Sequence, residues 1–522
     1  MYPAREWIGT YSGVLALTVG ALALRLAFVQ PEPIFPDSST YLSISRAVVE
    51  EGKLSTTFRE GGETFLPPLY PGLTAVVSGV VGRFTGAAYE WAAVLVSAVS
   101  GAAIVVPAWW LARTIFGAGA AWLAGCLVAT SPILVHWSGH MLTEALFISI
   151  AVAAVAAGWR ATQTQRPSWA LVAGLLCGLA YLTRVIGLIL IPAIGLWMIR
   201  PTGAARLDAQ PDSRRMLTVS LFIAGFLAVS IPYWAYLRLN LGVWSVTGSY
   251  GSIVEQLVRG GIPVSGEAGR AAHRGLFATA SNFFLDLGGY ASMVWTLSSI
   301  SLAFAVVSVL APPRNATLPA YGRFYLATVV GTYLIALLLV GTVSYRGEMA
   351  RYSAPVVPFI LILACGGIAY IAERVGRARG LVIGGAVCAL VFSFWVQISS
   401  VPGLYFFAVW RPTPPSPQRL LGLWMHDQLR GPLSVMSRKP YVPYFARATW
   451  YYTPATIDGV LSLARERHVD YLVVDRSVYA DSRSEQARLL EPGTPPMSLE
   501  LVAVQPLSGG GYFLALYRIK RT

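Results

Sequence analysis

The hydrophobic pattern of this chain consists of long apolar runs that recur as far as residue 401. The first extends from Ile8 to Val29, which is long enough to cross a bilayer as a helix. Ala21-Leu22-Ala23 inside it resembles a signal-peptide cleavage site, but the apolar run continues beyond it, so we predict a retained span. Further runs lie at residues 88–112, 118–137, 143–159, 168–183, 185–199, 216–238, 290–311, 324–342, 352–372 and 381–401. The pattern predicts a polytopic α-helical membrane protein with about eleven spans.

Two long polar segments interrupt these runs. Residues 30–87 form the first loop, in which Ser38 to Glu51 has the periodicity of a short amphipathic helix ended by Gly52. Leu73 to Val81 is apolar but too short to span, so we place both segments on the membrane surface. The second loop, residues 239–289, is glycine-rich, and loops of this length are often functional.

The composition changes after the last apolar run. Residues 411–417 are a proline-rich linker, so we divide the chain into a membrane domain, 1–411, and a soluble domain, 412–522. The soluble domain alternates short strands with helices, which predicts a small α/β sandwich of two or three layers. The predicted strands are Leu433–Met436, Tyr471–Val474, Leu499–Val504 and Phe513–Tyr517, and the predicted helices are Pro417–Leu429, Ile457–Arg467 and Ser482–Leu490.

The composition agrees with a membrane protein. Only 12% of the residues are charged, and the mean hydropathy is +0.58. The net charge of +14 does not indicate nucleic acid binding, because the basic residues punctuate apolar runs instead of forming one patch. The four cysteines lie within apolar runs and form no metal motif or disulfide framework, so we interpret them as core residues.

The distribution of arginine predicts the orientation. If the N-terminus is cytoplasmic, the inner segments hold thirteen arginines and the short outer loops hold Arg184, Arg346 and Arg351. The positive-inside rule then places both long loops and the C-terminal domain outside the cell or plasma membrane. The sequon at Asn315 falls on the cytoplasmic side and is not expected to be used.

Ionisable residues at membrane level are the candidates for chemistry, because they are costly to place there. Asp37 is either the N-cap of the amphipathic helix or, if Ser38 or Ser39 caps it, a free carboxylate. Glu144 opens a span behind Thr143, where it suits the helix dipole, but with His140 it also suits metal binding or recognition of a substrate hydroxyl.

Arginines on the outer side are candidates for phosphate recognition. Arg351 is preferred because outer loops otherwise avoid arginine and because a guanidinium binds phosphate with two donors. Arg346 and Glu348 also admit a simpler interpretation, an interfacial ion pair that anchors the helix. His273 is read as a loop histidine, with a metal role less favoured, and Asp475 as a loop cap at the end of a strand, with a site role less favoured.

A succession of short motifs resembles the GT-C superfamily of membrane glycosyltransferases, in particular the branch of protein O-mannosyltransferases and lipid A aminoarabinose transferases. The resemblance covers residues 1–402. Its motifs are Pro36-Asp37 with Tyr41 and Arg46, Pro67-Pro68-Leu69-Tyr70-Pro71, Thr143-Glu144-Ala145-Leu146-Phe147, Gly178-Leu179 with Thr183-Arg184, and Arg351-Tyr352 with Pro355 and Pro358.

The resemblance implies transfer of a sugar from a polyprenyl-phosphate donor to a lipid, glycan or protein hydroxyl on the outer face of the membrane. It implies that Asp37, the acidic residue of the first outer loop, is the general base and that the sugar is transferred with inversion. The substrate-binding residues expected are Tyr41, Glu144, Arg184, Arg346, Glu348, Arg351 and Tyr352.

The chain departs from the branch at two positions. Protein mannosyltransferases carry an Asp-Glu pair where Ser38 follows Asp37 here. The aminoarabinose transferases carry a glutamate where this chain has Phe65, with Glu63 two residues earlier. A divalent metal is therefore an open possibility without an assigned site, and Glu63, His140 and His273 are its weak candidates.

Two other functions are compatible with the pattern. One is a transporter or lipid exporter with an external sensor domain, although the spans carry few polar residues for a path. The other is a glycan polymerase or ligase that uses pyrophosphate-linked donors. Reconstitution with a labelled donor separates them, because a transferase changes the chemical partner of the label and a transporter changes only its side.

Overall fold

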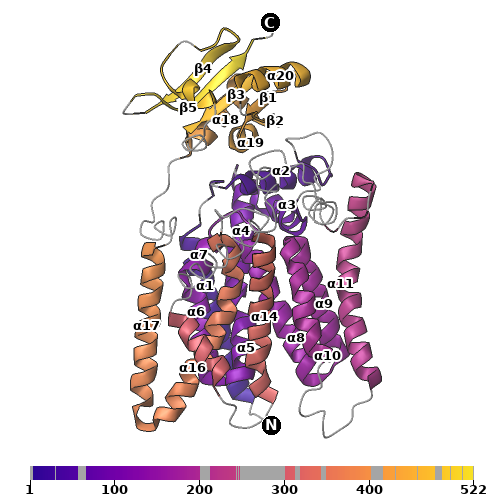
Figure 1. Ribbon diagram of the computed structural model, residues 1–522, viewed down its shortest axis with the longest axis vertical. Coiled ribbons are helices and arrows are strands. Elements are labelled where there is room, and N and C mark those ends of the chain that lie inside the picture. The colour runs from indigo at the N-terminus through magenta and orange to yellow at the C-terminus, as the bar shows by residue number, and fades with distance from the viewer. Residues whose placement is uncertain are drawn as a thin grey trace, which may run out of the picture. The chain divides into compact units, whose positions relative to one another are not determined.

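The computed structural model describes a mainly helical chain with a mixed sheet near its C-terminus (Figure 1). The described residues are 4–29, 31–33, 35–56, 66–86, 88–199, 212–242, 244, 246, 300–311, 318–341, 349–400, 415–429, 431–454, 456–476, 485–493, 495–507 and 510–520. They form two compact units. Unit 1 comprises residues 1–29, 64–70 and 94–410, and unit 2 comprises residues 30–63, 71–93 and 411–522.

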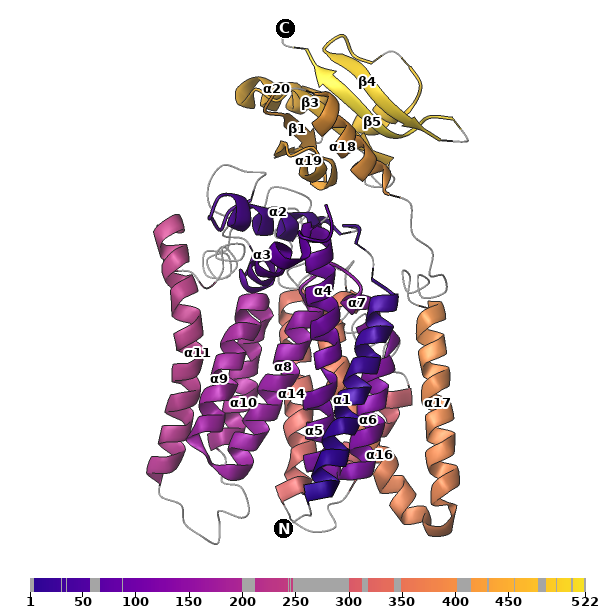
Figure 2. The same ribbon diagram turned by 180° about the vertical axis from the view of Figure 1, so that it is seen from behind.

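Unit 1 is a bundle of helices in which α5, α6, α8 and α16 stand side by side in both views (Figures 1 and 2). Its α-helices are α1 (Ala4–Ala27), the later part of α4 (Ala88–Ala103), α5 (Val105–Phe116), α6 (Ala118–Thr130), α7 (Pro132–Ser138), α8 (Glu144–Thr164), α9 (Pro167–Thr183), α10 (Leu190–Ile199), α11 (Asp212–Leu241), α14 (Leu318–Gly341), α15 (Met349–Ser353), α16 (Val357–Val375) and α17 (Arg379–Ser400). Among the described residues, short 3-10 segments join some of these helices: η1 (Val185–Ile189), η5 (Ala354–Val356) and η6 (Gly376–Ala378). The predicted apolar runs coincide with these helices to within two helical turns, and of the run at 290–311 only 300–311 is described.

The helices confirm a multi-pass membrane protein. Among the described residues, five helical stretches are long and apolar enough to cross a membrane, and six if the bent pair α6 and α7 counts as one span. The five are Thr10–Ala27, Ala88–Phe116, Glu144–Thr164, Ser213–Asn240 and Arg351–Ile398. Shorter apolar helices such as Pro167–Thr183 account for further predicted spans, so the count of about eleven crossings stays a prediction.

Helices α9 and α11 approach each other closely because α9 carries a GxxxG pattern, Gly174 to Gly178. A Cβ atom added at Gly174 would lie 1.9 Å from the carbonyl oxygen of Phe222 on α11. Small residues at such positions let helix backbones pack together in lipid, where apolar burial alone does not drive helices together. The pattern therefore fixes the contact between these two helices.

A buried arginine stabilises the break between α6 and α7. Ser131 and Pro132 interrupt the helix and bend it by 49°. Arg25 of α1, fully buried, donates from Nη1 to the carbonyl oxygen of Ala129 at 2.9 Å and from Nη2 to that of Val128 at 3.3 Å. Arg25 thereby satisfies carbonyl groups that the break leaves without helical partners.

Unit 2 contains the first loop, with α2 (Pro36–Glu50) and most of α3 (Leu69–Val81). Helix α2 begins two residues before the predicted start because Pro36 occupies its first turn, where the fixed proline φ suits a helix and the missing N–H costs nothing. Ser45 Oγ donates to the carbonyl oxygen of Pro71 at 2.9 Å and ties α2 to α3. The predicted amphipathic pattern is only partly correct, since Val49 is exposed while Ser38 and Ser39 are buried.

The C-terminal part of unit 2 is a five-stranded sheet in the order β2-β1-β3-β5-β4. Strands β1 (Ser434–Ser437), β2 (Thr449–Tyr452) and β3 (Tyr471–Asp475) are parallel, and β4 (Leu499–Pro506) and β5 (Tyr512–Ile519) are antiparallel additions (Figure 2). The four predicted strands are confirmed, and β2 was missed.

Helices cover both faces of this sheet, which makes it a three-layer sandwich. Strand β3 alternates, with Leu472 and Val474 in the core beneath α20 (Ile457–Arg467) and Tyr471 and Val473 in the core beneath α18 (Pro417–Gln428) and α19 (Tyr441–Phe445). The predicted third helix is a 3-10 segment, η8 (Glu485–Leu490), and residues 482–484 lie outside the described part. Two-sided burial explains why β3 reads as a continuous apolar run.

Candidate functional site

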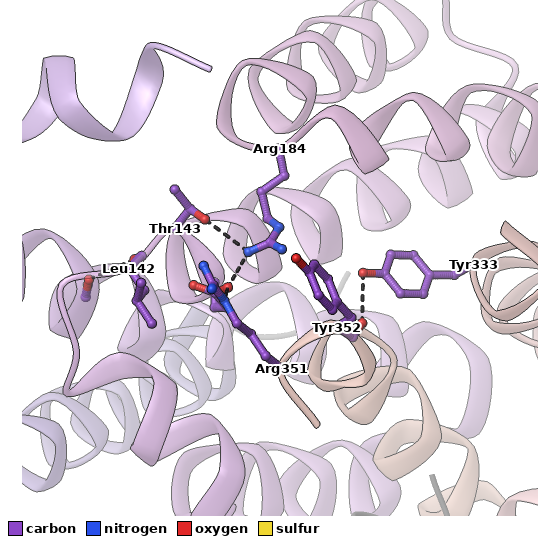
Figure 3. A network of polar contacts seen from close by, with 8 residues as sticks. Leu142, Thr143, Arg184, Tyr333, Arg351 and Tyr352 are labelled. Atoms are coloured by element: carbon purple, nitrogen blue, oxygen red, sulfur yellow. Dashed lines mark hydrogen bonds and ion pairs between the residues drawn. The ribbon is translucent and has the colours of Figure 1, made fainter. Parts of the chain in front are cut away.

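Glu144, Arg184 and Arg351 meet in unit 1 (Figure 3). Glu144 is the first residue of α8 and is 1% exposed. Its Oε1 accepts from Nη1 of Arg184, which follows α9, and from Nε of Arg351 on α15. The sequence proposed a role for each residue separately, and the structure brings all three onto one carboxylate oxygen.

The break after α9 places Arg184. Its backbone is extended, and its N–H still donates to the carbonyl oxygen of Ala180 at 2.9 Å. Gly187 then passes so close to α9 that an added Cβ would lie 2.6 Å from the nitrogen of Tyr181. Only a glycine fits this approach, which turns the chain and leaves the Arg184 side chain directed at α8.

Thr143 occupies the N-cap position of α8 but does not cap the helix with its side chain. Thr143 has helical backbone angles and makes no side-chain capping hydrogen bond. Its Oγ1 instead accepts from Nη1 of Arg184 at 3.1 Å. The arginine competes successfully for the hydroxyl because a charged donor makes the stronger hydrogen bond.

The segment that carries Arg351 is held by α14. Tyr333 of α14 donates its hydroxyl to the carbonyl oxygen of Tyr352 at 3.1 Å (Figure 3). The ring of Tyr352 lies 5.2 Å from the guanidinium carbon of Arg184, within the range of a cation–π contact. Pro355 prevents a regular helix here, so α15 is only five residues long and passes through η5 into α16. Tyr352 thus contacts the cluster through its ring, and its expected role in substrate binding stays a prediction.

A second chain of hydrogen bonds, which the sequence did not single out, supports the start of α8. The hydroxyl groups of Tyr70 and Ser97 are 3.0 Å apart, and Ser97 Oγ donates to the carbonyl oxygen of Leu142 at 3.2 Å. Tyr70 belongs to the motif Pro67–Pro71 and is fully buried. A polar side chain within that motif could have identified Tyr70 as a candidate, but the sequence does not show its partners, which are distant along the chain.

The cluster has the electrostatics of an anion site. Two guanidinium groups contact one carboxylate, so the three side chains together carry a formal charge of +1. Arg351 is 4% exposed. Within the described part of the chain, Oε2 of Glu144 has no hydrogen-bond partner. A net positive charge on these three side chains favours a phosphate or another anion, because a low dielectric screens the field little.

Asp37 and Tyr41 lie in unit 2, on α2. Asp37 is not the N-cap, since Phe35 holds that position and Asp37 follows Pro36 in the first turn. Neither Ser38 nor Ser39 caps the helix. The capping interpretation of Asp37 is therefore wrong, although its charge still suits the helix dipole. Tyr41 is buried, at 4% exposure.

The weak metal candidates do not form a cluster within the described residues, where no group of three or more His, Cys, Asp or Glu is suitably placed. His140 is buried, and its ring packs 4.5 Å from that of His136, centroid to centroid. Four other expected site residues, Glu63, His273, Arg346 and Glu348, lie outside the described residues. Asp475 accepts a hydrogen bond from Gln418 Nε2 at 2.8 Å.

Comparison with known proteins gives one family and several solved structures. Residues 67–235 match the family described as dolichyl-phosphate-mannose-protein mannosyltransferase. This segment contains both Glu144 and Arg184. Comparison with curated protein sequences finds no match.

Two solved structures have a similar fold. ArnT from Cupriavidus metallidurans, solved with undecaprenyl phosphate, is 15% identical with a TM-score of 0.60, covering 99% of this chain and 98% of ArnT. The oligosaccharyltransferase AglB from Archaeoglobus fulgidus, solved with an inhibitory peptide and a dolichol-phosphate, is 12% identical with a TM-score of 0.57, covering 90% of this chain and 70% of AglB. The matched segment and the shared fold agree with the resemblance to GT-C membrane glycosyltransferases seen in the sequence.

Proposed function

We propose that the protein transfers a sugar from a polyprenyl-phosphate donor to a hydroxyl group of a lipid, glycan or protein acceptor. Arg351 and Arg184 bind the donor phosphate, and Asp37 acts as the general base. The reaction takes place on the outer face of a cell membrane, with the N-terminus in the cytoplasm. The site belongs to a membrane domain of about eleven spans.

The observation that carries this proposal is the convergence of Arg184 and Arg351 on the buried Glu144. The carboxylate neutralises one of the two cations and holds both side chains in place, so the site is preorganised for an anion before a donor arrives. The similar proteins support the phosphate as that anion, since ArnT was solved with undecaprenyl phosphate and AglB with a dolichol-phosphate.

The chemistry requires one base and one stabilised leaving group. Asp37 accepts the proton of the acceptor hydroxyl while that oxygen attacks the anomeric carbon of the sugar. The bond between this carbon and the phosphate oxygen breaks, and the polyprenyl phosphate leaves with the bonding electron pair. The guanidinium groups stabilise the charge that develops on the phosphate, which reduces the need for a general acid. Direct displacement inverts the anomeric configuration.

The rate of sugar transfer by the Asp37→Asn variant tests whether Asp37 is the general base. We reconstitute the full chain in liposomes with a polyprenyl-phosphate donor that carries a labelled sugar, and we separate the lipid donor from the products. The wild type moves the label to a new chemical partner, and Asp37→Asn lowers the rate by a factor of roughly 10² to 10⁴, the usual contribution of a general base.

The matched control is Asp458→Asn, which removes an exposed carboxylate from the first turn of α20. This variant retains the wild-type rate. Substantial transfer by Asp37→Asn would reject Asp37 as the base. A label that changes only its side of the membrane in the wild type would support a transporter instead.

A further inference from the structure

The first loop is joined to the C-terminal domain within unit 2 by a buried arginine. Arg46 of α2, 8% exposed, donates from Nη1 to the carbonyl oxygen of Tyr444 at 3.2 Å. Its guanidinium carbon also lies 4.3 Å from the centroid of the Tyr444 ring. A desolvated cation over an aromatic face contributes more than an exposed ion pair does.

Tyr444 itself is fully buried and has a second partner on its other end. Its hydroxyl group donates to Glu90 Oε1 in the first turn of α4 at 3.1 Å. Burial and the neighbouring Glu90 carboxylate raise the pKa of Tyr444, so the hydroxyl keeps its proton at neutral pH. Tyr444 of the domain therefore contacts both Arg46 of α2 and the Glu90 carboxylate of α4.

Glu32 forms an anchor before α2. Its Oε2 accepts from Arg419 Nη1 at 3.0 Å, and its Oε1 accepts from the backbone N–H of Ser416 at 3.3 Å and from the Ser416 hydroxyl at 2.5 Å. Ser416 is the N-cap of α18, so the carboxylate lies where a helix attracts negative charge. This anchor combines four interactions with the Glu32 carboxylate: a charge pair, two hydrogen bonds and a helix dipole.

We infer that the C-terminal domain positions the general base. Glu32 lies before α2, and Arg46 lies on α2 after Asp37, so both flanks of the base are fixed to the domain. We call the residues that make these contacts the clasp: Glu32, Arg46, Glu90, Ser416, Arg419 and Tyr444. The clasp residues are positioning residues, because they act on the reaction through α2. This inference rests on the proposed function, in which Asp37 is the base.

A positioning role differs from general stabilisation in its kinetics. The arginines that bind the donor phosphate belong to unit 1, whereas the clasp belongs to unit 2. Loosening the clasp therefore lowers kcat and leaves the KM for the donor unchanged. A misplacement of about 1 Å costs as much as 10² in rate, so partial loosening by one substitution lowers kcat roughly tenfold.

The experiment compares Glu32→Gln and Tyr444→Phe in the full chain, reconstituted in lipid nanodiscs. Each substitution removes one polar function and keeps the shape of the side chain. The matched controls are Glu491→Gln, which loses an exposed ion pair with Arg476 in the same domain, and Tyr452→Phe, which changes an exposed ring. For every variant we measure kcat, the KM for the donor, and amide hydrogen exchange across α2.

In both clasp variants we expect kcat to fall roughly tenfold, the donor KM to stay within about twofold, and the amides of α2 to exchange faster. The controls keep wild-type values. A kcat equal to that of the controls, a KM that rises in proportion as kcat falls, or unchanged exchange in α2 would each overturn the inference. If the wild type transfers no sugar, the proposed function fails, and the exchange rates of α2 still decide whether the clasp holds this helix.

Discussion

At the scale of single residues, buried charges in this protein have partners where helices begin or break. Glu144 opens α8 and holds two arginines from other elements, and Arg25 satisfies the carbonyl groups at the end of α6. An isolated charge is costly in such surroundings, so each is retained only with compensating contacts. The same contacts make the effects of substitution predictable.

Replacing Arg351 by Met removes one of the two cations from the cluster. The remaining pair of Glu144 and Arg184 is neutral overall, so the attraction for a phosphate falls. We expect the donor affinity, measured by titration of a fluorescent polyprenyl phosphate into nanodiscs, to fall ten- to a hundredfold, since a hydrogen bond to a charged group contributes about 1.5–3 kcal/mol. Arg374→Met, an exposed site at the end of α16, serves as the control. Unchanged affinity in Arg351→Met would place the phosphate elsewhere.

Replacing Arg25 by Met leaves the carbonyl groups of Val128 and Ala129 without their donors. The methionine fills much of the volume, so the loss comes mainly from unsatisfied polar groups and amounts to about 1–3 kcal/mol. A lower midpoint of thermal unfolding in detergent checks this. The same substitution at Arg113, which is exposed on α5, leaves the midpoint unchanged. Equal midpoints for both variants would show that the carbonyl groups find other partners.

The sequence singled out the residues of the cluster but did not predict that they touch one another. Glu144 and Arg351 are separated by 207 positions, and no local pattern encodes a contact at that distance. The capping role of Asp37 was wrong because Pro36 starts the helix two residues earlier than a cap at Asp37 would. Local sequence patterns identify candidate residues, whereas tertiary packing determines which residues they contact.

At the scale of elements, the long helices were predictable and the short pieces were not. A run of some twenty apolar residues has few alternatives in a bilayer, so residues 4–27 and 144–164 agree with the prediction to within a few residues. Strand β2 has only four residues at the edge of the sheet, with Tyr452 exposed, and it lacks the burial pattern that marks a strand. Helix α19 is similarly short.

Two glycines in helices give opposite predictions. Gly174→Ala places a methyl group against the backbone of α11 and is expected to lower stability by about 2 kcal/mol, because the backbone cannot yield as a side chain does. Gly331→Ala in α14 has no atom within 4 Å of the new Cβ and gains the higher helix propensity of alanine, about 0.5–1 kcal/mol. Thermal unfolding of both variants in the same lipid checks the pair. A Gly174→Ala protein as stable as Gly331→Ala would contradict the close contact of α9 and α11.

At the scale of the whole molecule, the orientation in the membrane is predicted from the distribution of charge. In a variant without the four native cysteines, a cysteine at Arg467 in the C-terminal domain is expected to react with a membrane-impermeant thiol reagent added outside intact cells. A cysteine at Arg214, on a segment predicted to be cytoplasmic, reacts only after the cells are opened. Both positions are exposed, so access of the reagent depends on the side of the membrane. Reversed labelling would invert the topology and move Asp37 to the cytoplasm.

The clasp also determines when the protein can become active during its synthesis. Arg46 and Tyr444 are 398 residues apart, so α2 leaves the ribosome long before its partner is made. At roughly 5–20 residues per second this interval lasts about 20–80 s. Throughout it, the segment with Asp37 lacks the contacts that hold it, while most of the membrane helices are inserted. If Asp37 is the base, as proposed, it is fixed in place only after Tyr444 has been made.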